Sequence, residues 1–150
     1  LEYAYSVMPE LSVTSDVIVG FPGETYEEFR ETVSLVQQAN FTSMYTFIFS
    51  PREGTKAASM PDPVSREEKG RWFKELLDAQ EVIAAKRTAS AVGKVYRVLC
   101  ESVSKGGLIE GRTEGNVIVE FPADSSVIGT FRNVKVTESL TWILRGELAD

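Results

Sequence analysis

Hydrophobic positions in the first third of the chain follow two different spacings. Residues 13–21 contain consecutive β-branched side chains, which predict a strand buried on both faces. Across residues 26–39 apolar side chains recur every three or four positions, which predicts a helix. A second run rich in β-formers, residues 43–50, predicts another strand. Strand, helix and strand in this order indicate a βαβ unit with two parallel strands.

The first strand ends at a Gly-Phe-Pro-Gly turn, residues 20–23. Thr25 and Glu28 have the spacing of a capping box for the helix that follows, and Asn40 suits a left-handed C-cap. Ligands of parallel α/β units gather at the carboxyl ends of the strands, so this turn is the predicted place for a binding site. Its glycines fit neither a Walker loop nor a complete G-x-G-x-x-G, and an ordinary βα connection also explains them.

The middle of the chain predicts one long amphipathic helix. Residues 51–63 are irregular and rich in Gly, Ser and Pro, and Ser65 with Glu68 forms a second capping-box pattern. The helix should continue to about residue 90. Its apolar face is expected to carry Trp72, Phe73, Leu76, Leu77, Gln80, Ile83 and Ala84.

After Gly93 the pattern changes to short alternating segments that are broken by glycine. Turns are expected at residues 105–107 and 114–116. Five short strands in so few residues predict a small, closed, antiparallel barrel of OB-like type. The predicted strands cover residues 94–103, 108–112, 116–121, 130–137 and 140–148.

Composition adds limits on the kind of protein. The chain has 150 residues, 43% of them hydrophobic and 25% charged, which suits one globular domain or two small ones. No apolar run approaches the roughly 18 residues of a membrane span, and no membrane partner is expected. The only cysteine is Cys100, which excludes an internal disulfide framework and fits a reducing cytoplasm. Because the sequence starts at Leu1 rather than Met, we expect a piece of a longer protein.

Charge separates the two ends of the chain. The net charge of −6 argues against nucleic acid as a partner, but residues 89–150 carry 7 basic and 8 acidic side chains and are nearly neutral. RNA binding to the barrel would use cations and groups that contact bases. Arg112 and Arg145 each follow or precede a glycine that leaves room for a ligand, although ion pairs with Glu114 or Glu147 are an alternative. The predicted RNA-binding residues are Arg97, Lys105, Arg112, Asn116 and Arg145.

Four motifs resemble one family in the same order along the chain. They are Asp-Val-Ile-Val-Gly-Phe-Pro-Gly-Glu-Thr at residues 16–25, Ser-Pro-Arg-Glu-Gly-Thr at 50–55, Gly-Arg-Thr at 111–113 with Asn116, and Thr-Trp-Ile-Leu-Arg-Gly-Glu at 141–147. Together they resemble the radical-SAM methylthiotransferases, and most closely the MiaB-type tRNA methylthiotransferases. The resemblance implies that residues 1–63 end a radical-SAM core, that residues 64–90 form a connecting helix, and that residues 91–150 are a TRAM barrel.

The resemblance also implies an activity for the longer parent. Such enzymes attach a methylthio group to a hypermodified adenosine beside the anticodon, using S-adenosylmethionine and two 4Fe–4S clusters. The partner would be the anticodon stem-loop of tRNA, in the cytoplasm. By carry-over, the residues that face the S-adenosylmethionine site would be Val17, Val19, Gly20, Tyr45 and Arg52. Arg52 is otherwise explained as a solvated loop arginine.

The sequence lacks the ligands for that chemistry. Cluster binding needs three thiolates, and this chain has Cys100 alone and no histidine. We therefore expect that this piece binds no cluster, has no activity by itself and self-associates or shields its exposed strand edge with its own helix. Two other functions stay open: a sister, RimO-type methylthiotransferase acting on another tRNA adenosine or a ribosomal protein, and a non-catalytic RNA-binding module.

Overall fold

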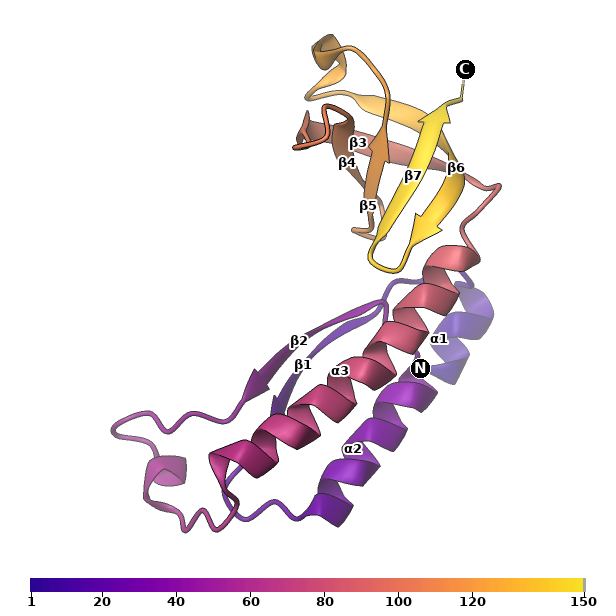
Figure 1. Ribbon diagram of the computed structural model, residues 1–150. Helices are drawn as coiled ribbons and strands as arrows, with labels where there is room; N and C mark the ends of the chain where they lie inside the picture. Colours follow the sequence, from indigo (N-terminus) through magenta and orange to yellow (C-terminus); the bar gives the residue numbers. More distant parts are fainter. Residues whose placement is uncertain (150) are drawn as a thin grey trace. The chain divides into compact units, whose positions relative to one another are not determined.

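The structure, a computed structural model, describes residues 1–149 and divides them into two compact units. One unit is formed by residues 13–83, and the other by residues 1–12 together with residues 84–149. Helix α3 (Arg66–Ala89) contributes to both (Figure 1). No helix of the described residues is long and apolar enough to cross a membrane.

The first unit contains the predicted βαβ arrangement. Strand β1 (Thr14–Val19) and strand β2 (Ser43–Ile48) are parallel, and helix α2 (Tyr26–Ala39) connects them. A short 3-10 helix, η1 (Lys56–Ser59), lies in the irregular segment before α3. One face of the sheet packs on both helices in a core built from Val19, Phe29, Val33, Val36, Trp72, Leu76 and Ile83.

Local sequence signals explain the helix ends in this unit. Thr25 Oγ1 accepts a hydrogen bond from the Glu28 amide, and the Glu28 carboxylate accepts one from the Thr25 amide, which confirms the capping box. Asn40 ends α2 with φ 54°, as predicted. At the start of α3, Ser65 Oγ accepts from the Glu68 amide, while the Glu68 carboxylate accepts from the indole of Trp72.

One expectation about the first strand is wrong. Residues 13–21 were predicted to be buried on both faces, but Ile18 is 53% exposed and only alternate residues of β1 reach the core. Within residues 13–83 both helices pack on one face of this two-stranded sheet, and the other face is exposed at Ile18, Tyr45 and Phe47. The burial pattern of β1 therefore alternates, like that of a sheet covered on one side.

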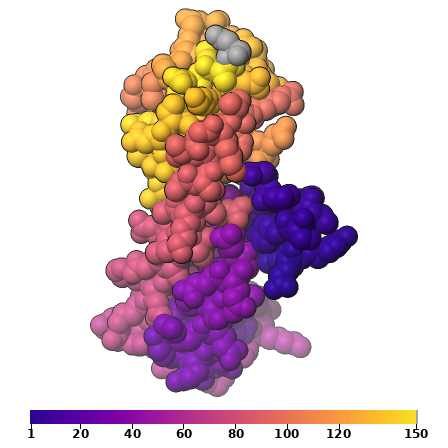
Figure 2. Space-filling view, turned by 90° about the vertical axis from the view of Figure 1, so that its right-hand side faces the viewer, coloured from indigo at the N-terminus to yellow at the C-terminus, as the bar shows by residue number. Residues whose placement is uncertain are grey.

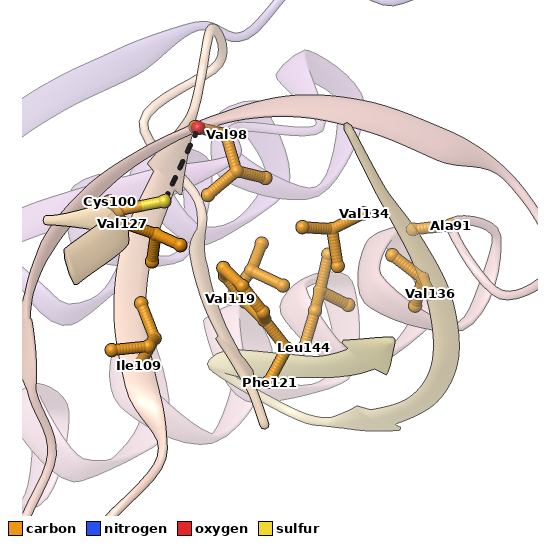
Figure 3. Packing of buried hydrophobic residues seen from close by; sticks show 10 residues of the cluster. All are labelled: Ala91, Val98, Cys100, Ile109, Val119, Phe121, Val127, Val134, Val136 and Leu144. Carbon is orange, nitrogen blue, oxygen red and sulfur yellow. Dashed lines mark hydrogen bonds between the residues drawn. The ribbon is translucent and has the colours of Figure 1, made fainter. Parts of the chain in front are cut away.

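The second unit contains a closed five-stranded barrel. Its strands are β3 (Val95–Val103), β4 (Ile109–Thr113), β5 (Ile118–Phe121), β6 (Phe131–Leu140) and β7 (Ile143–Leu148), with the 3-10 helix η2 (Ser125–Val127) between β5 and β6. Ten buried side chains fill its interior: eight come from the strands, Ala91 precedes β3, and Val127 lies in η2 (Figure 3). Helix α1 (Glu2–Val7) belongs to the same unit, and none of its residues is buried, so it forms an open surface (indigo in Figure 2).

The predicted all-antiparallel barrel is wrong at one seam. The strands close in the order β3-β4-β5-β7-β6, and β5 pairs with β7 in parallel, whereas the other four pairs are antiparallel. Strand directions cannot alternate all the way round a ring with an odd number of members. A closed barrel of five strands must therefore contain at least one parallel pair, and the barrel is mixed.

Candidate functional site

The glycine turn after β1, residues 20–23, is held by the side chain of Glu24. Gly20 has φ 73°, and the Glu24 carboxylate accepts hydrogen bonds from the amides of Gly20 and Phe21 at 2.5 and 3.2 Å. A Cβ at Gly20 would lie 2.5 Å from Lys69 Cδ. Position 20 therefore requires glycine both for its backbone conformation and for its contact with Lys69. Because Glu24 already occupies these two amides, the turn does not present them to an anion.

Lys69 is a buried lysine beside the glycine turn that the sequence interpretation missed. Lys69 is 4% exposed. Its ammonium nitrogen forms an ion pair with Asp62 at 2.5 Å and lies 5.6 Å from the ring centroid of Phe49. A buried lysine needs such a partner. The signal was present, because Lys69 lies three residues before Trp72 and so falls on the buried face of α3.

The predicted S-adenosylmethionine residues do not lie on one surface. Val19 is buried and Val17 is partly buried against the helices, whereas Tyr45 is 65% exposed on the opposite face of the sheet with Ile18 and Phe47. Gly20 is buried at the strand end. The exposed apolar face of the sheet is thus formed by side chains other than those of Val17 and Val19.

Arg52 lies in the exposed segment after β2. Its carbonyl accepts hydrogen bonds from the amide and hydroxyl of Thr55, and its guanidinium forms no ion pair with a carboxylate of residues 1–149.

Near the glycine turn, a shallow and open depression is lined by Phe21, Pro22, Gly23, Glu24, Glu28 and Thr32. No group of three or more His, Cys, Asp or Glu side chains within the described residues is arranged to hold a metal.

The three barrel arginines that were predicted to bind RNA each lie near a glutamate, but Arg112 and Arg145 do not pair with the glutamates that were suggested. Arg112 Nε lies 3.1 Å from Glu101, and its Nη1 donates to Asn116 Oδ1 at 3.1 Å. Arg145 lies 3.8 Å from Glu120 and 3.6 Å from Glu138. The suggested partners of these arginines, Glu114 and Glu147, are therefore wrong, because strand pairing brings other glutamates beside them.

Arg97 has a different environment on the outside of β3. Its guanidinium carbon lies 4.0 Å from the ring centroid of Phe131, and its nearest carboxylate, Glu114, is 3.8 Å away.

Lys105 is exposed in the loop between β3 and β4. Asn116 lies in the turn before β5 with φ 61°, a left-handed conformation that asparagine adopts more readily than most residues. Its backbone conformation, as well as its contact with Arg112, therefore explains an asparagine at this position.

The glycines beside Arg112 and Arg145 do not leave room for a ligand. A Cβ at Gly111 would lie 2.4 Å from the carbonyl oxygen of Leu99, and one at Gly146 would lie 2.5 Å from that of Lys135. Both positions face the barrel interior, where neighbouring strands approach closely. The predicted role of these glycines in ligand access is thus replaced by a role in closing the barrel.

Cys100 is a packing residue of the barrel interior. Its side chain points among the buried aliphatic residues in Figure 3, and the thiol lies 4.0 Å from the Val98 carbonyl oxygen. Burial raises the pKa of the Cys100 thiol and so favours its protonated form. A buried neutral thiol is not a cluster ligand, and the residues of this chain do not fit an iron–sulfur centre.

Comparisons with known proteins agree with this description of the barrel. Residues 89–149 match the TRAM domain family. The chain is 43% identical over 147 residues to tRNA-2-methylthio-N(6)-dimethylallyladenosine synthase of Thermoanaerobacter pseudethanolicus, covering 97% of this chain and 31% of the relative. The proteins of the same name from Symbiobacterium thermophilum and Geobacillus kaustophilus are 42% and 45% identical, over 96% and 97% of this chain and 31% and 28% of theirs.

These matches confirm the resemblance predicted from the four motifs. Residues 89–149 match the TRAM domain family, and 97% of the chain is similar to proteins named tRNA-2-methylthio-N(6)-dimethylallyladenosine synthase. The chain spans less than a third of the length of the curated relatives above.

Proposed function

We propose that this chain is the C-terminal part of an enzyme that adds a methylthio group to N6-dimethylallyladenosine in tRNA. The observation that supports it is similarity at 43% identity along 97% of the chain to a synthase with that name. The similarity is not limited to the TRAM domain, since it also covers the βαβ unit. A parent with this activity would work in the cytoplasm, where tRNA is modified.

In this proposal the barrel contacts the tRNA, at the anticodon stem-loop. The candidates are Arg97, Lys105, Arg112, Asn116 and Arg145, which all lie on the barrel or its loops. A single small domain makes few phosphate contacts, so the 150-residue chain alone should bind RNA weakly, at about 1 to 100 μM. Substrate choice would then depend on the catalytic core.

The βαβ unit would end the catalytic core and form part of its S-adenosylmethionine wall. Val17, Val19 and Gly20 would contribute through the backbone at the end of β1, because Val17 and Val19 direct their side chains toward the helices. Tyr45 would contribute its exposed ring, and Arg52 would lie at the rim. S-adenosylmethionine would supply the methyl group and the radical. The two clusters would need cysteines outside this chain, so the chain alone should be inactive.

A chimera tests this function. The matching third of the Thermoanaerobacter pseudethanolicus relative would be replaced by this chain, and the chimera incubated with S-adenosylmethionine and tRNA that carries N6-dimethylallyladenosine. We expect mass spectrometry of the digested tRNA to show the methylthiolated nucleoside. The control is a chimera with Gly146→Ala, which should impair barrel folding. A well-folded, cluster-loaded chimera without product would contradict the proposal.

A further inference from the structure

The outside of the barrel offers faces that differ in charge. Barrels of this topology commonly bind oligonucleotides across their second and third strands, which here are β4 and β5. On that face Glu110 and Glu120 lie directly opposite each other. Arg145 is in register with Glu120 but lies 3.8 Å from its carboxylate, and it also approaches Glu138. Arg112 lies on the same face but is paired with Glu101, so the two opposed carboxylates make this face less favourable for RNA phosphates.

A different face, the β3–β6 strip, carries no acidic side chain at its six positions. We define the strip as the outward residues of the antiparallel ladder between β3 and β6, whose inward neighbours Val98 and Val134 are buried. It consists of three cross-strand pairs, Val95 with Lys135, Arg97 with Asn133, and Leu99 with Phe131. The strip thus combines two cations, one amide and three apolar side chains.

Two residues of the strip form a stacked pair that is open to solvent. The guanidinium of Arg97 lies 4.0 Å from the centroid of the Phe131 ring. The Arg97 side chain is 58% exposed and Phe131 is 48% exposed. Glu114 is the carboxylate nearest to Arg97, at 3.8 Å, which is longer than a direct hydrogen bond. An exposed arginine plane on an aromatic ring is a platform on which a nucleobase can stack.

The cation at the other end of the strip is available for a phosphate. Lys135 is exposed and forms no ion pair within residues 1–149, although Glu147 lies across from it on β7. Asn133 lies between Lys135 and Phe131 on the same face and carries both amide donors and a carbonyl acceptor. The order along the strip is therefore a stacking group, a group that can bond to a base edge, and a cation.

We propose that the β3–β6 strip binds an unpaired segment of RNA, with one base stacked on Arg97 and Phe131 and a neighbouring phosphate at Lys135. This rests on the proposed tRNA contact of the barrel, and it assigns that contact to β3 and β6 in place of β4 and β5. The segment must be unpaired, because bases inside a helix do not expose a face for stacking on a side chain. Arg112, whose Nε lies 3.1 Å from Glu101, would then act chiefly as the partner of that glutamate.

The test is the affinity of the 150-residue chain for a short unstructured RNA and for the same RNA in a duplex, by fluorescence anisotropy. We expect the single strand to bind more tightly. Phe131→Ala should weaken that binding about fivefold or more, with no change in its salt dependence. Phe131→Trp should preserve it, Arg97→Lys should weaken it although the charge is kept, and Lys135→Ala should reduce the salt slope by about one.

Two controls separate the strip from general effects. Trp142→Ala removes an aromatic side chain of similar exposure, 50%, outside the strip, and Lys74→Ala removes a cation from the other unit. Both should bind nearly as well as the unchanged chain. A loss at Trp142→Ala equal to that at Phe131→Ala, or a preference for the duplex, would overturn the assignment. If strip variants bind normally, only this inference fails; if the unchanged chain binds no RNA, the proposed tRNA contact fails first.

Discussion

At the scale of single residues, several side chains have a different role from the one that their motifs suggest. Arg112 and Arg145 stand in family-like motifs, yet each is paired with a glutamate from a neighbouring strand. Their glycine neighbours face inward against the backbone of the next strand. The packing and ion pairs of the barrel therefore explain why an arginine and a glycine stand side by side in these two motifs.

Gly146→Ala should destabilise the barrel by about 1–3 kcal/mol, because the added methyl group would overlap the carbonyl of Lys135 and the Val134 side chain. The matched control is Gly106→Ala, where the nearest atom to a Cβ is 3.8 Å away, and its effect should stay within about 0.5 kcal/mol. Urea unfolding followed by tryptophan fluorescence, which includes the signals of Trp72 and Trp142, measures both variants against the unchanged chain. Equal stability of the two variants would refute the close-packing argument.

Cys100 should not react with a thiol reagent at pH 8 while the chain is folded. Burial raises the pKa of this thiol, so the folded state favours the protonated form, and that stabilisation is lost as the pH rises through the folded pKa. The measurement is the rate of reaction with Ellman's reagent with and without denaturant. We expect one thiol per chain to appear only after unfolding; rapid labelling of the folded chain would show that Cys100 is accessible.

At the scale of elements, sequence and structure agree where the signals are local. The Thr25 capping box, the Asn40 C-cap and helix α2 follow from residues a few positions apart, and all are confirmed. The parallel seam, the glutamate partners of the arginines and the one-sided burial of β1 depend on strands brought together from distant parts of the chain. Periodicity within one segment does not contain that information.

Thr25→Ala should lower the stability of the βαβ unit by about 1 kcal/mol, because it removes the acceptor for the Glu28 amide at the start of α2. Thr25→Ser keeps the hydroxyl and is the matched control. Trp72 fluorescence during urea unfolding reports on this unit when Trp142 is changed to Phe. If Ala and Ser variants unfold at the same urea concentration, the cap does not stabilise the helix.

At the scale of the molecule, the βαβ unit has an uncovered apolar face and unpaired strand edges. Ile18, Tyr45 and Phe47 are each more than half exposed on the face opposite the helices. We expect the chain to self-associate as its concentration rises, because strand edges and apolar faces pair when nothing covers them. Light scattering coupled to gel filtration measures this.

Ile18→Lys combined with Phe47→Lys should shift the chain toward monomer, since both substitutions place charge on the exposed face. Leu35→Lys, at a position that is 60% exposed on α2, is the matched control and should not change the association. A chain that stays monomeric at every concentration would contradict the expectation of self-association.

The odd number of strands also determines how the barrel comes apart. The ring consists of a three-strand meander, β3 to β5, and a hairpin, β6 with β7, which are joined at two seams. The β3–β6 seam has five antiparallel residue pairs, whereas the β5–β7 seam has three parallel pairs, a weaker kind of ladder. The β5–β7 ladder should therefore open before the β3–β6 ladder, and its backbone amides should exchange faster. The β3–β6 ladder, which carries Arg97 and Phe131, would then act as the hinge of this opening.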